Sequence, residues 1–148
     1  MPIKTFRGLM ADGAQDTISL HTKDGAIGYR IVKFQIMAET PTGGGAVEHI
    51  VQIWKIKQTT VPTAAPAPID FSDNRLLAAA IYIAEDSPQY AHTSDVIFDK
   101  EIFNQDIYVT HSDTNGTDNV NYYIELEQVK LDLNENTVAT LKDIRNVA

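Results

Sequence analysis

The sequence predicts an all-β protein, an antiparallel β-sandwich of about eight strands, and three observations indicate this class. Apolar and polar residues alternate with a period of two through most of the chain, which is typical of strands with one face in water. The apolar runs are rich in Val, Ile, Tyr and Phe, residues that favour extended backbone. Clusters of Gly, Pro, Asn and Asp separate the runs and supply turns. Jelly-roll and immunoglobulin-like sandwiches both accept this strand count, and we expect the jelly-roll-like form.

Eight runs fit the strand pattern. In chain order, the expected strands cover residues 3–10, 17–21, 27–37, 47–57, 74–85, 95–99, 102–111 and 119–133. The run at 47–57 has few polar positions, so we expect it at the centre of a sheet. The run at 74–85 mixes helix-forming and strand-forming residues, and we interpret it as a buried strand. Gly13 and the pair Asn115-Gly116 mark tight turns, and the second predicts a hairpin into the last strand.

Two expected strands change the phase of their apolar face. Such a change predicts a β-bulge, or, for the strand at 27–37, a central strand that is buried on both sides near the switch. In 27–37 the apolar face switches between Ile31 and Val32, and in 119–133 it switches at Glu127-Gln128. A bulge sets two residues of one strand against one residue of its partner, which restores the alternation.

The end of the chain follows a helical pattern. Asn134 is a suitable N-cap, and Val138, Leu141 and Ile144 recur at the spacing of one helix face. We therefore expect a short C-terminal helix of about three turns that packs on the sandwich.

The chain has 148 residues, the size of one domain, so we expect residues 1–148 to form a single β-sandwich. Two segments, 40–46 and 59–68, are too rich in glycine or proline to form strands. The first predicts a flexible loop and the second an extended, Pro-rich loop or arm. The residues that set these conformations are Pro41, Gly43, Gly44, Gly45, Pro62, Pro66 and Pro68.

Charge and composition exclude several classes of function. The chain has 20 acidic and 12 basic residues and a formal net charge of -8, so we expect no binding to nucleic acid or to anionic membranes. No apolar run approaches the roughly 20 residues that cross a bilayer, and the N-terminus lacks the apolar stretch of a signal peptide, so we expect a soluble, unexported protein. The absence of cysteine excludes disulfides, thiolate metal sites and cysteine nucleophiles.

Motifs for catalysis are absent from the sequence as well. It has no Gly-x-Ser-x-Gly elbow and no phosphate-binding glycine loop. His21, His49, His92 and His111 lie in separate regions without the spacing of a compact metal site, so we expect no metal, although a distant pair can meet across strands.

Two acidic groups have both a chemical and a structural interpretation. Glu125 and Glu127 share a strand face, as glycosidase carboxylates sometimes do, but a solvated strand face explains them better. The loop at 113–118 offers oxygen ligands, but it lacks the EF-hand spacing and the closing Glu, so a plain turn is favoured over a calcium site. We expect no catalytic residue and no cofactor.

Tyrosines suggest one alternative function. Tyr82, Tyr90, Tyr108, Tyr122 and Tyr123 are enough to line a sugar-binding face, as in β-sandwich carbohydrate modules. Tyr122 and Tyr123 must point to opposite faces of their strand, so at most one of them joins such a platform.

The C-terminal third resembles known proteins. The resemblance rests on residues 97–99 (IFD), 103–111 (FNQDIYVTH) and 121–145 (NYYIELEQVKLDLNENTVATLKDIR). These segments resemble small uncharacterised virion structural proteins of marine tailed bacteriophages, whereas the earlier strands are compatible only in pattern.

This resemblance implies a non-enzymatic structural role, foremost that of a capsid decoration or cement protein. Such a protein is made in the host cytoplasm and bridges neighbouring subunits of the major capsid protein on the outer surface of the virion. It is expected to be a homo-oligomer, with a trimer favoured. A tail or baseplate component and a carbohydrate-binding module are the alternatives. We expect contacts with the capsid or between subunits at Pro41, Gly43, Gly44, Gly45, Pro62, Pro66 and Pro68.

Overall fold

The computed structural model describes residues 2–22, 25–41, 45–86, 89–98 and 101–132, and this part of the chain is all-β. The C-terminal helix expected from Asn134 lies outside the described residues, as do Gly43 and Gly44. The eight strands are β1 (Ile3–Met10), β2 (Gln15–Ile18), β3 (Ile27–Ala38), β4 (Val47–Trp54), β5 (Leu76–Asp86), β6 (Gln89–Ile97), β7 (Ile107–Asp113) and β8 (Val120–Lys130).

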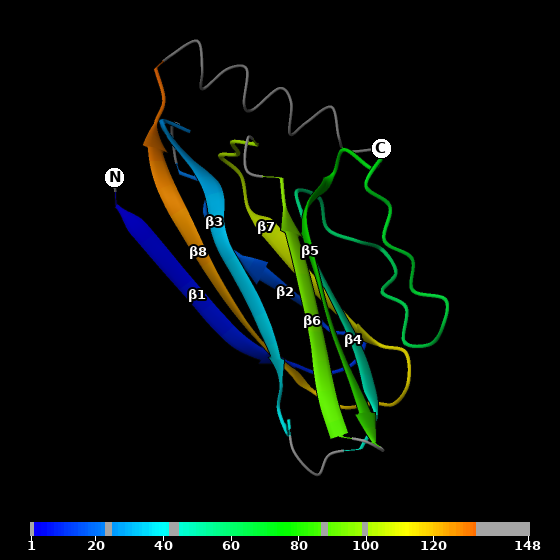
Figure 1. The fold of residues 1–148 in the computed structure, drawn as a ribbon. Helices are drawn as coiled ribbons and strands as arrows, with labels where there is room; N and C mark the ends of the chain where they lie inside the picture. Colours follow the sequence, from blue (N-terminus) through cyan, green and yellow to red (C-terminus); the bar gives the residue numbers. More distant parts are fainter. Residues whose placement is uncertain (1, 23–24, 42–44, 87–88, 99–100, 133–148) are drawn as a thin grey trace.

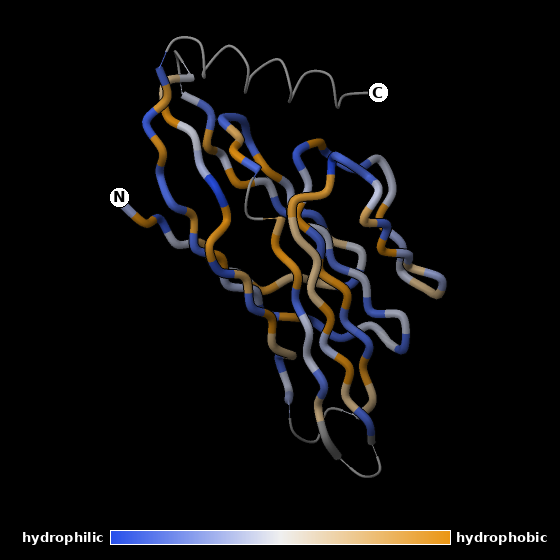
Figure 2. The backbone as a smooth tube through the Cα atoms, turned by 45° about the horizontal axis from the view of Figure 1, so that its top comes forward, coloured by the Kyte–Doolittle hydropathy of each residue, from blue (hydrophilic) through white to orange (hydrophobic). Residues whose placement is uncertain are grey.

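The strands form two antiparallel sheets that pack as a sandwich, as the sequence predicts (Figure 1). The three-stranded sheet has the order β1-β8-β3, and the five-stranded sheet has the order β2-β7-β4-β5-β6. β4 is central, which confirms the interpretation of its apolar run. Figure 2 shows the alternation of apolar and polar residues along the strands, whose inward side chains form the core between the sheets.

The strand order is that of a jelly roll with one pair missing. An antiparallel ribbon of eight strands that folds over on itself brings together its first and eighth, second and seventh, third and sixth, and fourth and fifth strands. β1–β8, β2–β7 and β4–β5 are paired, but among the described residues β6 pairs with β5 and not with β3. β3 and β6 nevertheless lie beside each other (Figure 1). We call the gap between residues 34–38 of β3 and residues 91–95 of β6 the seam.

One predicted bulge is present and the other is wrong. The register of β3 against β8 shifts between Ile31 and Lys33, where the apolar face of the sequence changes phase. In β8, by contrast, the register is regular through Glu127 and Gln128 on both sides. The irregular strand of this pair is β3, where Val32 has no partner in β8. This single bulge in β3 accommodates the phase changes of both strands.

The hairpin predicted at Asn115-Gly116 is also wrong, although the chain does turn there. β7 and β8 belong to different sheets, so the turn crosses the sandwich instead of pairing its flanking strands. The carboxylate of Asp113 accepts hydrogen bonds from the backbone N–H groups of Asn115 and Asp118, at 3.1 and 3.0 Å. These bonds hold a compact turn without any ladder between the two strands.

Several expected strand boundaries differ from the structure; β4 ends at Trp54 and β8 at Lys130, three residues earlier than predicted. β2 lies earlier than residues 17–21, and β6 begins well before residue 95. β7 begins at Ile107 and not at residue 102, because the preceding chain bends where the Asp106 carboxylate accepts from the N–H groups of Leu20 and His21. Phe103 makes only an isolated bridge to Tyr29.

The segment between β4 and β5, residues 55–75, begins across the outer face of the five-stranded sheet. The backbone N–H of Gln58 donates to the Gln15 side chain at 2.8 Å, and the Gln15 amide donates back to the Gln58 carbonyl at 2.9 Å. Thr63 lies against Gly13, at the turn between β1 and β2. We call residues 55–75 the strap, because the first part of this segment is held against the sandwich. The strap joins β4 to β5, which are neighbours in the sheet.

Candidate functional site

The loop residues expected to make contacts are placed in two regions of the surface. Pro41, Pro66 and Pro68 are exposed, and Pro62 is half-buried in the strap. Gly45 is exposed and has a φ of 82°, a conformation that favours glycine. The two sets are separate: Pro41 and Gly45 lie between β3 and β4, whereas the three strap prolines lie between β4 and β5.

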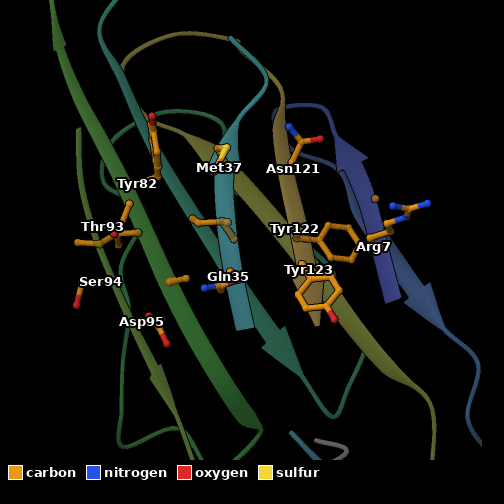
Figure 3. Close-up of a pocket in the computed structure, with 14 residues that line it drawn as sticks. Arg7, Gln35, Met37, Tyr82, Thr93, Ser94, Asp95, Asn121, Tyr122 and Tyr123 are labelled. Carbon is orange, nitrogen blue, oxygen red and sulfur yellow. The ribbon is translucent and has the colours of Figure 1, made fainter. Parts of the chain in front are cut away.

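A groove of about 730 Å³ opens at the seam and extends over the outer face of the three-stranded sheet (Figure 3). Its volume lies in the range of pockets that hold small ligands. The groove brings together side chains from five strands, which include Arg7, Gln35, Tyr82, Asp95 and Tyr123. No sequence motif connects these residues, so only the fold assembles them.

Tyr123 is the aromatic centre of the outer face of the three-stranded sheet. Arg7 and Gln35 lie directly opposite it on β1 and β3. The Tyr123 hydroxyl donates to Glu125 Oε2 at 2.7 Å, which fixes the ring. Tyr122 points the opposite way, as expected, and its hydroxyl donates to Asp16 at 2.9 Å across the sandwich. The side chain of Tyr90 lies outside the described residues.

The edges of the three-stranded sheet leave backbone groups unpaired. On β3, the Glu39 N–H donates to the Asn119 carbonyl, so alternation turns the N–H and C=O groups of Phe34, Ile36 and Ala38 away from β8 and into the seam. On β1, the Pro2 carbonyl accepts from the Gln128 N–H. By the same alternation, four residues of β1 turn their backbone N–H and C=O groups away from β8, to the outer edge of the sheet: Ile3, Thr5, Arg7 and Leu9.

Two histidines that are distant in sequence meet inside the sandwich. His49 Nδ1 lies 2.8 Å from His111 Nε2, and His111 Nδ1 lies 2.9 Å from the Ala11 carbonyl oxygen. A carbonyl only accepts, so in the neutral pair His111 carries its proton on Nδ1 and His49 donates from its own Nδ1 to His111. This order leaves His49 Nε2 as a buried acceptor with no partner among the described residues.

Both rings are held in the neutral form. Burial, followed by the charge of a protonated His111, lowers the pKa of His49 to about 4. Burial also lowers the pKa of His111, against the nearby carboxylates of Asp12 and Asp113. The sequence contains a signal for this placement, because His49 alternates with Val47 and Val51 and His111 with Val109, all of them inward-facing residues.

The acidic groups considered for catalysis or calcium binding have structural partners. Glu125 accepts from Tyr123, and Glu127 pairs with Arg30 at 3.3 Å. The buried carboxylate of Asp113 also accepts from the Glu48 N–H at 3.2 Å, in addition to the two bonds within its turn. Among the described residues, no group of three or more His, Asp or Glu side chains has the arrangement of a metal site.

Comparisons with known proteins do not show a family for this chain. No family model and no curated protein matches the chain. The chain is similar to a solved structure entitled "Bacillus endospore appendages form a novel family of disulfide-linked pili", with 10% sequence identity and a TM-score of 0.34 over 88% of this chain and 89% of that one. At this TM-score the similarity says nothing about the function of this chain. The part of the chain that the structure describes has no helix long and apolar enough to span a membrane.

Proposed function

We propose that the protein is a non-enzymatic structural component of a phage virion, and that it acts as a capsid decoration protein on the outer capsid surface. The observation that carries the proposal is the resemblance of the C-terminal third to virion structural proteins. The major capsid protein is the partner that this role requires.

The surface of the sandwich is compatible with such a role. The three-stranded sheet exposes its outer face and two strand edges, and Leu9 and Met37 on that face are 49% and 57% exposed. Contiguous exposed apolar patches rimmed by polar residues are typical of surfaces that contact other proteins, and Leu9 and Met37 lie in one row on either side of Asn121. The exposed prolines of the strap and Pro41 add contacts on other sides of the molecule.

Quantitative mass spectrometry of purified virions tests the proposal. We expect a copy number comparable to that of the major capsid protein. A small copy number would instead assign the protein to the tail or baseplate, and its absence from virions would overturn the structural role. Deletion of residues 64–68 tests the strap: unchanged particle binding would exclude it from the contact.

A carbohydrate-binding module is the second candidate, and the row Arg7, Tyr123 and Gln35 is the observation that favours it. A fixed aromatic ring flanked by planar polar groups is suited to stack on a sugar and bind its hydroxyls. Glycan-array binding that is lost in Tyr123→Ala but kept in Tyr108→Ala would support this function. Tyr108 is the matched control because it is a half-buried tyrosine on the other sheet. No glycan binding by the wild type would exclude it.

A further inference from the structure

The missing β3–β6 pair leaves an acceptor for a strand. Phe34, Ile36 and Ala38 turn their backbone groups into the seam from β3. On β6 the Phe98 N–H donates to the Leu77 carbonyl, so alternation also turns the backbone groups of Thr93 and Asp95 into the seam. Unpaired backbone groups along a strand edge match the periodic donors and acceptors of an extended polypeptide, and β3 offers such an edge.

The described side chains of β6 support an open seam. Residues 91–96 are all exposed, although alternate residues of a strand point to opposite faces. A fourth strand beside β3 would cover the inward set, which includes Thr93 and Asp95. The three-stranded sheet is therefore short by one strand at the place where the five-stranded sheet extends beyond it.

The same sheet offers a strand that fits. β1 has an open outer edge, where Thr5 and Arg7 present unpaired backbone groups. β1 carries Lys4 and Arg7 and no acidic residue, whereas Asp95 in the seam and Glu39 at the end of β3 are acidic and exposed. Edge and seam are thus complementary in charge within a protein whose net charge is -8.

The strand directions permit a continuous sheet. β1 and β3 both pair antiparallel with β8, so they run parallel to each other. A second copy related by rotation about the strand direction places its β1 parallel to β3 of the first copy. Each copy then uses its β1 on one neighbour and its seam on the other, and such a head-to-tail contact closes into a ring when the rotation allows.

We propose that the protein self-assembles by pairing the open edge of β1 of one copy with the open edge of β3 in the seam of the next. The inference deepens the proposed function by naming the contact between copies. Its test uses the isolated protein, so failure of self-assembly is distinguishable from failure of particle binding.

Edge-blocking prolines and sedimentation velocity test the proposal. Thr5→Pro and Ile36→Pro each remove an N–H that points out of the sheet, and proline is tolerated in edge strands at such positions. We expect the wild type to form a closed oligomer and each variant to raise its dissociation constant about tenfold or more. An equimolar mixture of the two variants should form a dimer and nothing larger, because it contains one intact edge and one intact seam.

Two matched controls separate edge blocking from loss of packing or folding. Ile36→Ala removes the side chain but keeps the N–H, so it should assemble like the wild type. Thr17→Pro places proline at an outward N–H of β2, the edge of the other sheet, and should also assemble. A monomeric wild type, self-association of Ile36→Pro at wild-type strength, or a mixture without dimer would each overturn the proposal.

Discussion

The outer faces of the two sheets differ in how far they are covered. On the five-stranded sheet, the outward side chains of Gln52, Trp54 and Thr110 are buried, and the strap is bonded to this face through Gln58 and Gln15, which lies opposite Thr110. On the three-stranded sheet, the outward row of Leu9, Asn121 and Met37 is exposed. The comparison indicates that the first face stabilises the fold, whereas the second, which we call the open face, is available for binding. Substitutions on the first face should therefore change stability, and substitutions on the open face should change binding.

The largest expected difference is between the two aromatic side chains at these faces. Trp54→Ala should lower the free energy of unfolding by about 3–5 kcal/mol, because it opens a cavity under the strap and leaves Thr110 without the donor that now lies 3.0 Å away. Tyr123→Ala, on the open face, should cost about 1 kcal/mol or less. Urea unfolding measures both values, and equal losses would contradict the comparison.

The second-largest effect is expected from acid, which should destabilise the five-stranded sheet before the three-stranded sheet. The folded pKa of His49 is about 4, below its ordinary value of 6.5, so the unfolded chain binds the proton more readily. Stability is complete above the unfolded pKa and falls as the pH drops from about 6.5 toward 4, by about 3 kcal/mol in total. His49→Gln should flatten this dependence in urea unfolding, whereas His92→Gln on exposed β6 should not.

Hydrogen exchange sharpens the same prediction. His49 and His111 belong to β4 and β7, so the amides of these strands should lose protection at mildly acidic pH before those of β3 and β8. Loss of protection that begins in the three-stranded sheet would refute the assignment of the acid response to the histidine pair.

A smaller effect should appear where the strap meets the sandwich. Gly13 and Gly45 have φ values of 79° and 82°, so an alanine at either position is strained by about 1–2 kcal/mol. A Cβ on Gly13 would also lie 2.6 Å from Thr63 Cγ2, whereas a Cβ on Gly45 meets nothing within 4 Å. Gly13→Ala should therefore lower the melting temperature more than Gly45→Ala. Adding Thr63→Ser, which removes that methyl group, should cancel the excess.

The smallest effect is expected for the ion pair on the open face. Glu127→Gln should change the free energy of unfolding by less than about 1 kcal/mol, because the Arg30 side chain is 42% exposed and water screens the pair. The change should shrink further in high salt. A loss as large as that of Trp54→Ala would mean that the open face also stabilises the fold.

The strands and the fold class follow from the period of two, because alternation reports which side chains face the core. The same periodicity does not identify a partner strand, so it does not distinguish the hairpin predicted after Asp113 from the crossing turn that the structure shows. The sequence does not predict most of β6, because neither face of residues 91–96 is covered. Apolar and polar residues therefore have no reason to alternate along this strand. The groove takes residues from five strands, and the order of those strands has no local signal in the sequence.

Trp54 is the single tryptophan of the chain, and it is the last residue of β4, directly before the strap. Its indole fluorescence therefore reports on one place in the molecule. Release of the strap would bring the indole into water and shift its emission to longer wavelength, whereas a ligand or a second copy on the open sheet would leave the emission unchanged. The protein contains its own optical probe, which distinguishes local uncovering from binding without any label.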